Sequence, residues 1–157
     1  MRIEQKVTVD APRHLVWEYV TEPANYPVFM DGLTRWEVAG DRHSGPGARY
    51  RMLIRVGAAD VGGLIEIVEW QPEGDMAWSS VTGVDQRGRW RLRDLGDDRT
   101  RVTFRFQYGV AGGGIPGLIA ERVAAISLNR RFRLSLLNVK RAVEDRAVEL
   151  AAPSGAQ

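Results

Sequence analysis

Hydrophobic and polar residues alternate along most of the first two thirds of the chain, which predicts β-strands. Ile3, Val7 and Val9 alternate with charged residues in the first run, and Gln5 interrupts its apolar side. Two short helical patterns follow at 13–20 and 24–30, separated by Pro23. Six further alternating runs are bounded by glycine or proline turns, at 34–40, 48–56, 61–70, 76–83, 87–95 and 100–110. Short strands joined by short turns predict an antiparallel sheet with one buried face.

The period changes after residue 110, where apolar residues recur at helical spacing. Residues 115 to 147 contain no glycine beyond Gly117 and no proline beyond Pro116. This segment predicts one helix about 45–50 Å long, enough to cross a whole sheet. Helices segregated against one antiparallel sheet define the α+β class. The sequence therefore predicts a single domain over 1–147, followed by a disordered tail at 148–157.

The composition excludes several kinds of site and segment. A chain of 157 residues fits one domain that folds without a metal or disulfide. The absence of cysteine excludes thiolate catalysis, disulfides and cysteine-ligated zinc. The N-terminus lacks the pattern of a secretory signal, and no apolar run approaches the roughly 18 residues that cross a bilayer. We therefore expect a cytoplasmic protein without a membrane span.

Four stretches resemble one known family, and one of them, TRVTFRFQYGV at 100–110, is similar to its last strand. The segment VTVDAPRHLVWEYVTEPANYP at 7–27 resembles the opening of the polyketide cyclase/dehydrase-like branch of the START/Bet v 1 (SRPBCC) superfamily. Residues 68–95, with Trp78, Ser80, Gly83 and Gly88, resemble its middle, and LLNVKRAVED at 136–145 resembles its last helix. The resemblance implies a helix-grip fold: a curved, seven-stranded antiparallel sheet wrapped around the C-terminal helix, with a cavity between them. Members bind lipids, sterols, polyketides, quinones or plant hormones, and a minority are cyclases or aromatases.

The candidate ligand-binding residues occupy the apolar side of the predicted strands and of the long helix. On the strands they are Trp36, Tyr50, Met52, Ile54, Trp78, Ser80, Trp90, Phe104, Phe106 and Tyr108. On the helix they are Arg122, Ala125, Asn129 and Phe132. Ligand pockets are mostly apolar with a few polar groups that orient the ligand. This set predicts a binding or carrier protein for a small hydrophobic ligand, oriented by Tyr50, Ser80, Arg122 or Asn129.

An enzyme of the cyclase or dehydratase type is the first alternative. It needs an acid/base group inside the cavity, and the candidates are Glu66, Tyr50 and Tyr108. Glu66 shares a strand face with Leu64, Val68 and Trp70, whereas Ile65, Ile67 and Glu69 take the other face. Both faces are mixed, so the direction of Glu66 stays open.

Other motifs give weaker signals. Residues 112–117 satisfy G-x-G-x-x-G, but no parallel strand follows, so a flexible hinge is favoured over a nucleotide site. His14 and His43 lack partners at metal-ligand spacing and are expected on the surface. We expect no cofactor and no metal.

Arginines at spacing two form a predicted basic stripe. Arg87, Arg89, Arg91 and Arg93 share one strand face, and Arg101 and Arg105 are expected beside them. The acidic residues expected to neutralise the stripe in part are Glu4, Glu69, Asp94 and Asp97. The net charge of +2 and the lack of stacking aromatics favour a solvated outer face, and no nucleic acid is expected. A protein or RNA interaction module remains the second alternative, in a chain expected to be a monomer or homodimer.

Overall fold

The computed structural model describes residues 1–109 and 115–153, with the side chains of 115–123 excepted. The elements of this part of the chain are β1 (Arg2–Val9), α1 (Arg13–Thr21), a 3-10 turn (Pro23–Asn25), α2 (Tyr26–Phe29), β2 (Leu33–Ala39), β3 (Arg49–Val56), β4 (Ala59–Gln71), β5 (Asp75–Ser80), β6 (Gln86–Gly96), β7 (Arg99–Tyr108) and α3 (Ile115–Ala151). This order confirms the predicted α+β arrangement of one strand, two short helices, six strands and a long helix.

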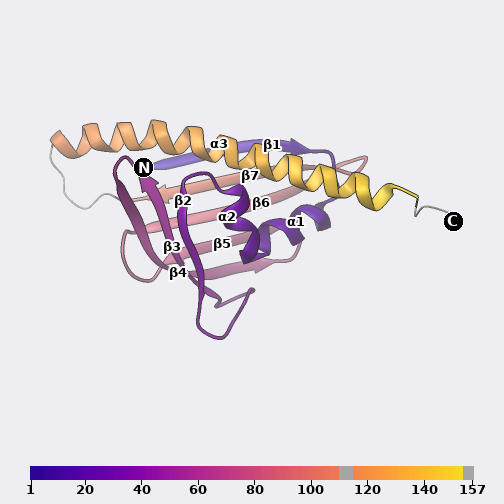
Figure 1. Cartoon of the computed structure of the whole chain (residues 1–157), viewed down its shortest axis with the longest axis horizontal. Helices are drawn as coiled ribbons and strands as arrows, with labels where there is room; N and C mark the ends of the chain where they lie inside the picture. Colours follow the sequence, from indigo (N-terminus) through magenta and orange to yellow (C-terminus); the bar gives the residue numbers. More distant parts are fainter. Residues whose placement is uncertain (110–114, 154–157) are drawn as a thin grey trace.

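The strands form one antiparallel sheet in the order β1-β7-β6-β5-β4-β3-β2. The first strand therefore joins the sheet beside the last one, and β1 and β2 are its two edges. Figure 1 shows α1 and α2 in front of the strands, while α3 runs the length of the molecule alongside β1. We call the face that meets these helices the inner face and the opposite one the outer face. The arrangement is the predicted helix-grip fold.

Helix α3 is bonded to both margins of the curved sheet. On the β1 side, Lys140 Nζ donates to the carbonyl of Thr8 at 2.9 Å, and Gln5 Nε2 donates to Asn129 Oδ1. On the β2 side, the backbone N–H of Asp31 donates to Ser135 Oγ at 2.9 Å. These contacts explain why a glutamine interrupts the apolar side of β1, since that position lies next to the helix. The helix thereby closes the open side of the sheet.

The inner face and the helices share one hydrophobic core. The residues of α3 that are buried in it include Leu128, Phe132, Leu136, Val139 and Val143. They recur at three- and four-residue intervals, the spacing of one helical face. Each fully buried apolar side chain contributes roughly 1.5–3 kcal/mol relative to exposure. Tertiary packing of this stripe, more than helix propensity, therefore holds α3 on the sheet.

Helix α3 ends later than the sequence predicts. It continues to Ala151, so residues 148–151 of the predicted tail are helical. Pro153 is the first residue after 147 that opposes a helix, because the residues between them are all compatible with one. Within the described residues, no helix is both long enough and apolar enough to cross a membrane.

Candidate functional site

The inner face carries a continuous cluster of aromatic rings. Trp36 is stacked between Tyr26, at a ring-centroid distance of 4.0 Å, and Tyr50, at 4.9 Å. Trp36 also meets Trp78 edge-on at 6.1 Å. Edge-on and stacked ring pairs each add about 0.5–1.5 kcal/mol beyond their buried area. The cluster therefore fixes the positions of the rings that line this face.

A second group of rings joins the sheet to α3. Phe132 of α3 lies 5.1 Å from Phe104 and 5.2 Å from Phe106, measured between ring centroids. Phe104 in turn contacts Trp78 at 5.8 Å and Trp90 at 4.5 Å. Every one of these five rings is buried. The predicted inward position of all five is confirmed.

A glycine sets the position of Trp78. Gly88 lies directly opposite Trp78 in the register of β5 and β6, and both face inward. A Cβ at Gly88 would overlap the indole carbons Cε2 and Cζ2 of Trp78. The indole therefore lies on the bare backbone of β6, an arrangement that requires glycine at this position.

Three buried polar atoms near this cluster have no hydrogen-bond partner among the described residues. They are Trp36 Nε1, Trp78 Nε1 and Gln86 Oε1. Gln86 is only 3% exposed and lies two residues before Gly88 on the same side of β6. A buried polar atom without a partner costs about 1–3 kcal/mol. Within the described part of the chain, two donors and one acceptor on the inner face are therefore left without a partner.

The tyrosine hydroxyls of the cluster have partners. Tyr26 Oη accepts from Trp90 Nε1 at 3.0 Å, and burial raises the pKa of Tyr26 well above its usual value. Tyr50 Oη donates to the carbonyl of His43 at 2.7 Å. Burial, with a smaller effect of the Glu22 charge, raises the pKa of Tyr50 to about 12. Both phenols are therefore neutral at physiological pH.

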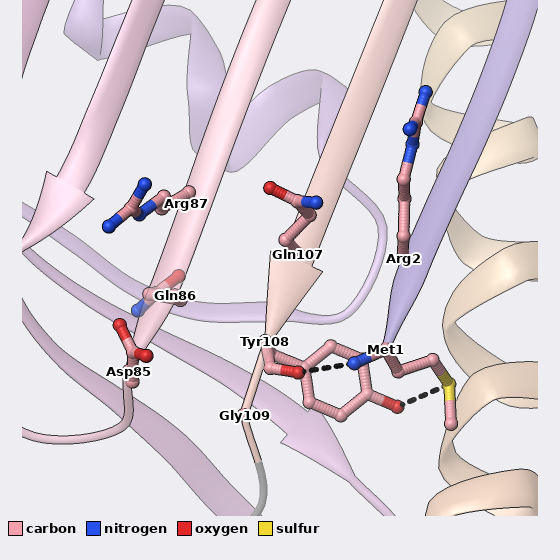
Figure 2. Close-up of a pocket in the computed structure, with 8 residues that line it drawn as sticks. All are labelled: Met1, Arg2, Asp85, Gln86, Arg87, Gln107, Tyr108 and Gly109. Carbon is pink, nitrogen blue, oxygen red and sulfur yellow. Dashed lines mark hydrogen bonds between the residues drawn. The ribbon is translucent and has the colours of Figure 1, made fainter.

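An open pocket of about 480 Å³ lies at the start of β1 and β6 and the end of β7. Figure 2 shows Arg2, Gln107 and Arg87 standing on one side of the strands, while the Tyr108 ring lies beside Met1. Ser80, half-buried nearby, donates to Asp85 Oδ1 at 3.3 Å. Its hydroxyl also accepts the backbone N–H of Gln86 at 3.2 Å. Ser80 therefore orders the β5–β6 turn beside the pocket.

Glu66 points away from the inner face, so the alternative in which it faces inward is wrong. Its Oε1 accepts from Arg49 Nε at 2.9 Å on the outer face. Ile65 and Ile67 occupy the inner positions on either side of it. The set of side chains that share a face also changes along β4, because a β-bulge shifts its register against β5 between Ile67 and Glu69. Beyond the bulge Glu69 faces outward.

The helix candidates separate into three cases. Phe132 is fully buried in the ring cluster, and Ala125 is half-buried. Asn129 is exposed and pairs with Gln5 at the β1 edge, so its predicted position inside the cavity is wrong. The side chain of Arg122 lies outside the described residues, as do Gly112, Gly113 and Gly114 of the glycine motif.

The remaining candidate positions differ in burial. Tyr50, Met52 and Ile54 are buried on the inner side of β3, whereas Trp36 and Tyr108 are half-buried. His14 and His43 are exposed. In the part of the chain that the structure describes, no three His, Asp or Glu residues lie close enough together to hold a metal ion.

The arginine stripe lies on the outer face and is largely ion-paired. Arg89 binds Glu69 through two contacts of 3.0 and 2.5 Å, and Arg105 binds Glu4 at 2.8 Å. The predicted partner Asp94 instead accepts the backbone N–H of Gly96 in the β6–β7 turn, and Asp97 adopts a left-handed turn conformation. Asp94 lies at the irregular end of β6, where the register shifts between Asp94 and Gly96, and Asp97 lies in the turn that follows.

Sequence reasoning missed three residues of these two faces. Asp75 binds Arg91 at 3.1 Å and Arg93 at 3.2 Å, and its position directly opposite Arg91 is the signal that could have identified it. Tyr26, in the Tyr-Pro pair of the family motif, lies at the centre of the ring cluster. Gln86 lies inward by simple alternation with Arg87. Gln86 could have been found by extending the period of its strand, whereas the role of Asp75 follows only from the register of β5 against β6.

Comparison with known proteins agrees with this geometry. Residues 1–144 match the family described as polyketide cyclase / dehydrase and lipid transport. An uncharacterized 17.2 kDa protein of Streptomyces lincolnensis is 25% identical over 158 aligned positions, covering 99% of this chain and 97% of that protein.

Solved structures share the fold over nearly the whole length. TTHA0849 of Thermus thermophilus has a TM-score of 0.79 at 17% identity, covering 97% of this chain and 100% of that one. The Zhui aromatase/cyclase of Streptomyces sp. R1128 has a TM-score of 0.69 at 22% identity, covering 100% and 99%. A START superfamily protein of Mycobacterium smegmatis has a TM-score of 0.65 at 13% identity, covering 96% and 99%. The chain therefore belongs to the polyketide cyclase/dehydrase and lipid transport family.

Proposed function

We propose that the protein is a carrier for a small hydrophobic molecule with one oxygen-bearing end, bound between the inner face of the sheet and α3. The observation that carries this proposal is a set of polar atoms among buried rings that have no partner in the described part of the chain, namely Trp36 Nε1, Trp78 Nε1 and Gln86 Oε1. A ligand carbonyl or hydroxyl oxygen would accept from an indole N–H, and a hydroxyl would donate to the glutamine. The rings would supply most of the affinity through apolar contact.

Binding without catalysis is favoured over the cyclase or dehydratase alternative. The buried polar residues on the inner side of the described chain are Gln86, Thr100 and Ser135, none of which exchanges a proton near neutral pH. Glu66 lies on the outer face, and the Tyr50 hydroxyl is committed to the His43 carbonyl. General acid–base catalysis works best with a pKa near the working pH, and the pKa of Tyr50 is raised to about 12. The third predicted acid/base candidate, Tyr108, donates its hydroxyl to Met1 Sδ at 3.1 Å.

The interaction-module alternative has less support. Glu4, Glu69 and Asp75 pair with four of the six arginines of the stripe, namely Arg89, Arg91, Arg93 and Arg105. Ion-paired guanidinium groups have less to gain from nucleic-acid phosphates, since an existing partner must be displaced first.

The test is native mass spectrometry of the purified protein, followed by thermal melting with a panel of fatty acids, quinones, sterols and aromatic polyketides. A bound hydrophobe, or a panel compound that raises the melting temperature, is the expected result. At a ligand concentration of 100 times Kd the stabilisation is about 2.7 kcal/mol, which corresponds to roughly 5–10 °C for a chain of this size. An apo mass together with no shift from any compound would contradict the proposal, and chemical conversion of a bound compound would favour the enzyme.

Two tryptophan variants locate the site. Trp36→Phe removes an unpartnered donor of the inner face, whereas Trp70→Phe removes another half-buried tryptophan, whose ring meets Trp17 at 5.0 Å outside the cluster. Trp36→Phe should weaken ligand binding about 10-fold, the worth of one hydrogen bond of about 1.4 kcal/mol. Trp70→Phe should leave the affinity unchanged. Equal effects of the two substitutions would place the ligand elsewhere.

A further inference from the structure

The solvent-facing side of α3 carries exposed aliphatic side chains in a line. Ile126 is 72% exposed, Leu134 44% and Leu137 42%. They lie on the side of the helix opposite Leu128, Phe132 and Val139, which are buried in the core. Isolated exposed apolar residues are ordinary, but a row of them along one helix face marks a surface that meets a partner.

Cationic side chains are interleaved with this row. Arg130, Arg133 and Arg141 are exposed on the same side of the helix, at the three- and four-residue intervals that bring side chains together. None of the three pairs with a carboxylate of the described residues. We call Ile126, Arg130, Arg133, Leu134, Leu137 and Arg141 the α3 ridge.

The ridge is positively charged throughout. From Ala124 to Val143, α3 carries no acidic residue; acids return only at Glu144 and Asp145. The other cations of this stretch are engaged elsewhere, since Arg131 donates to the Arg55 carbonyl and Lys140 pairs with Glu144. At 1.5 Å per residue the ridge is about 23 Å long. It offers one sign of charge together with aliphatic surface over that length.

We propose that the α3 ridge docks the protein onto the surface of an anionic lipid bilayer. A helix lies in a bilayer interface when its apolar side chains reach the boundary between headgroups and acyl chains while its arginines meet lipid phosphates. Val28 of α2, 75% exposed, adds an apolar side chain next to the ridge, since it lines a pocket of about 310 Å³ together with Arg141, Asn138 and Asp145. This inference rests on the solvent-facing side of α3 with Val28 beside it and does not depend on the carrier function.

Two other occupants fit the ridge less well. A second copy of the chain would place arginines against arginines, because a symmetric dimer brings the same patch of both subunits together. Nucleic acid would match the charge but would leave the aliphatic side chains against phosphates, and the ridge has no aromatic ring for a base to stack on. A bilayer matches both components.

The test measures flotation of the full chain with vesicles of phosphatidylcholine alone and of phosphatidylcholine with about 30% phosphatidylserine. We expect binding to the anionic vesicles only, weakened by high salt. The triple variant Arg130→Gln, Arg133→Gln, Arg141→Gln should reduce binding roughly 100-fold, about fivefold for each arginine removed from the lipid surface. Leu134→Ser with Leu137→Ser should weaken binding at every salt concentration.

A matched variant separates a docking surface from general charge. Arg51→Gln, Arg87→Gln, Arg101→Gln removes three exposed arginines from the outer face of the sheet, with the same change in net charge. It should retain binding within about threefold of the wild type, since its charges lie far from a bilayer that contacts α3. All these side chains are exposed, so near-ultraviolet circular dichroism should show each variant folded.

Any one of several results would overturn the proposal. They are equal binding to both vesicles, no binding to either, equal losses in the two triple variants, and a wild-type dimer that Leu134→Ser with Leu137→Ser dissociates. Retention of RNA by the ridge arginines in place of vesicles would assign the surface to nucleic acid and would also overturn it.

Discussion

The two faces of the sheet are built from the same strands but differ in whether their polar groups have partners. On the outer face, charged side chains of β1, β4, β5, β6 and β7 are joined in ion pairs, such as Arg89 with Glu69 and Arg105 with Glu4. On the inner face, the side chains are mostly rings and aliphatics, and three buried polar atoms lack partners among the described residues. Most charged groups of the outer face are thus paired within the chain, whereas these polar groups of the inner face are not.

This difference shows where a ligand has most to gain. A polar group that already has a partner gives little net energy when it exchanges that partner for another. A buried donor or acceptor without one recovers its full desolvation cost when a ligand supplies it. The number of arginines on a face is therefore a poor guide to binding. Whether each polar group already has a partner is a better guide.

The largest expected effect comes from Gly88→Ala on the inner face. The added Cβ would overlap the Trp78 indole, which has to move from its place in the ring cluster. Overpacking of this kind costs about 1–3 kcal/mol. Urea unfolding should show this loss, and the affinity for a ligand should fall with it, because Trp78 Nε1 is one of the unpartnered donors.

Gly74→Ala is the control for that variant. Its Cβ would meet the nearest atom, the Gln71 carbonyl oxygen, at an ordinary 3.5 Å. We expect a change within about 0.5 kcal/mol, as for most surface substitutions. Wild-type stability and affinity in Gly88→Ala would contradict the described position of Trp78.

A smaller effect is expected on the outer face from Asp75→Asn. Only 10% of the Asp75 side chain is exposed, and it binds both Arg91 and Arg93. The amide keeps the shape but loses the charge, so unfolding should be easier by about 1–2 kcal/mol. Ligand affinity should stay at the wild-type value, which distinguishes this face from the inner one. Glu37 pairs with Arg35, and 56% of the Glu37 side chain is exposed. Glu37→Gln should therefore change stability by less than about 0.5 kcal/mol.

The sequence predicted the fold well because the two periods are nearly uninterrupted. Alternation placed Tyr50, Met52 and Ile54 on the inner face, and helical spacing placed Phe132 and Val139 in the core. The end of α3 was missed because nothing between 147 and Pro153 opposes a helix. Strand and helix periods indicate which side chains face inward, but not at which residue a strand or helix ends.

The candidate site was less predictable, since it depends on local irregularity and on pairing across strands. The bulge after Ile67 exchanges the faces of β4, so Glu69 could not be placed by alternation. Asn129 is hydrogen-bonded to Gln5, and Asp75 is ion-paired with two arginines. Both pairings join residues far apart in the chain. Such pairs follow from the register of neighbouring strands, which the spacing of residues within one strand does not contain.

The smallest expected effect is the pH dependence contributed by Glu4. Hydrogen bonds from Arg105 and Arg2, with a further one from Lys6, lower the pKa of Glu4 to about 2. A carboxylate with a lowered pKa stabilises the folded state above its unfolded pKa of about 4.3 and loses that contribution as the pH falls towards 2. Glu4→Gln should therefore be less stable than wild type above about pH 4.3, and the difference should shrink between about pH 4 and 2.

The size of this difference should stay below about 1 kcal/mol, because the carboxylate and its arginines are in contact with solvent that screens their attraction. Urea unfolding of both proteins at a series of pH values measures it. A constant difference down to pH 2 would mean that Glu4 stabilises the sheet by packing alone. The outer face would then owe its stability to the shape of its side chains, and the contrast with the inner face would rest on geometry and not on charge.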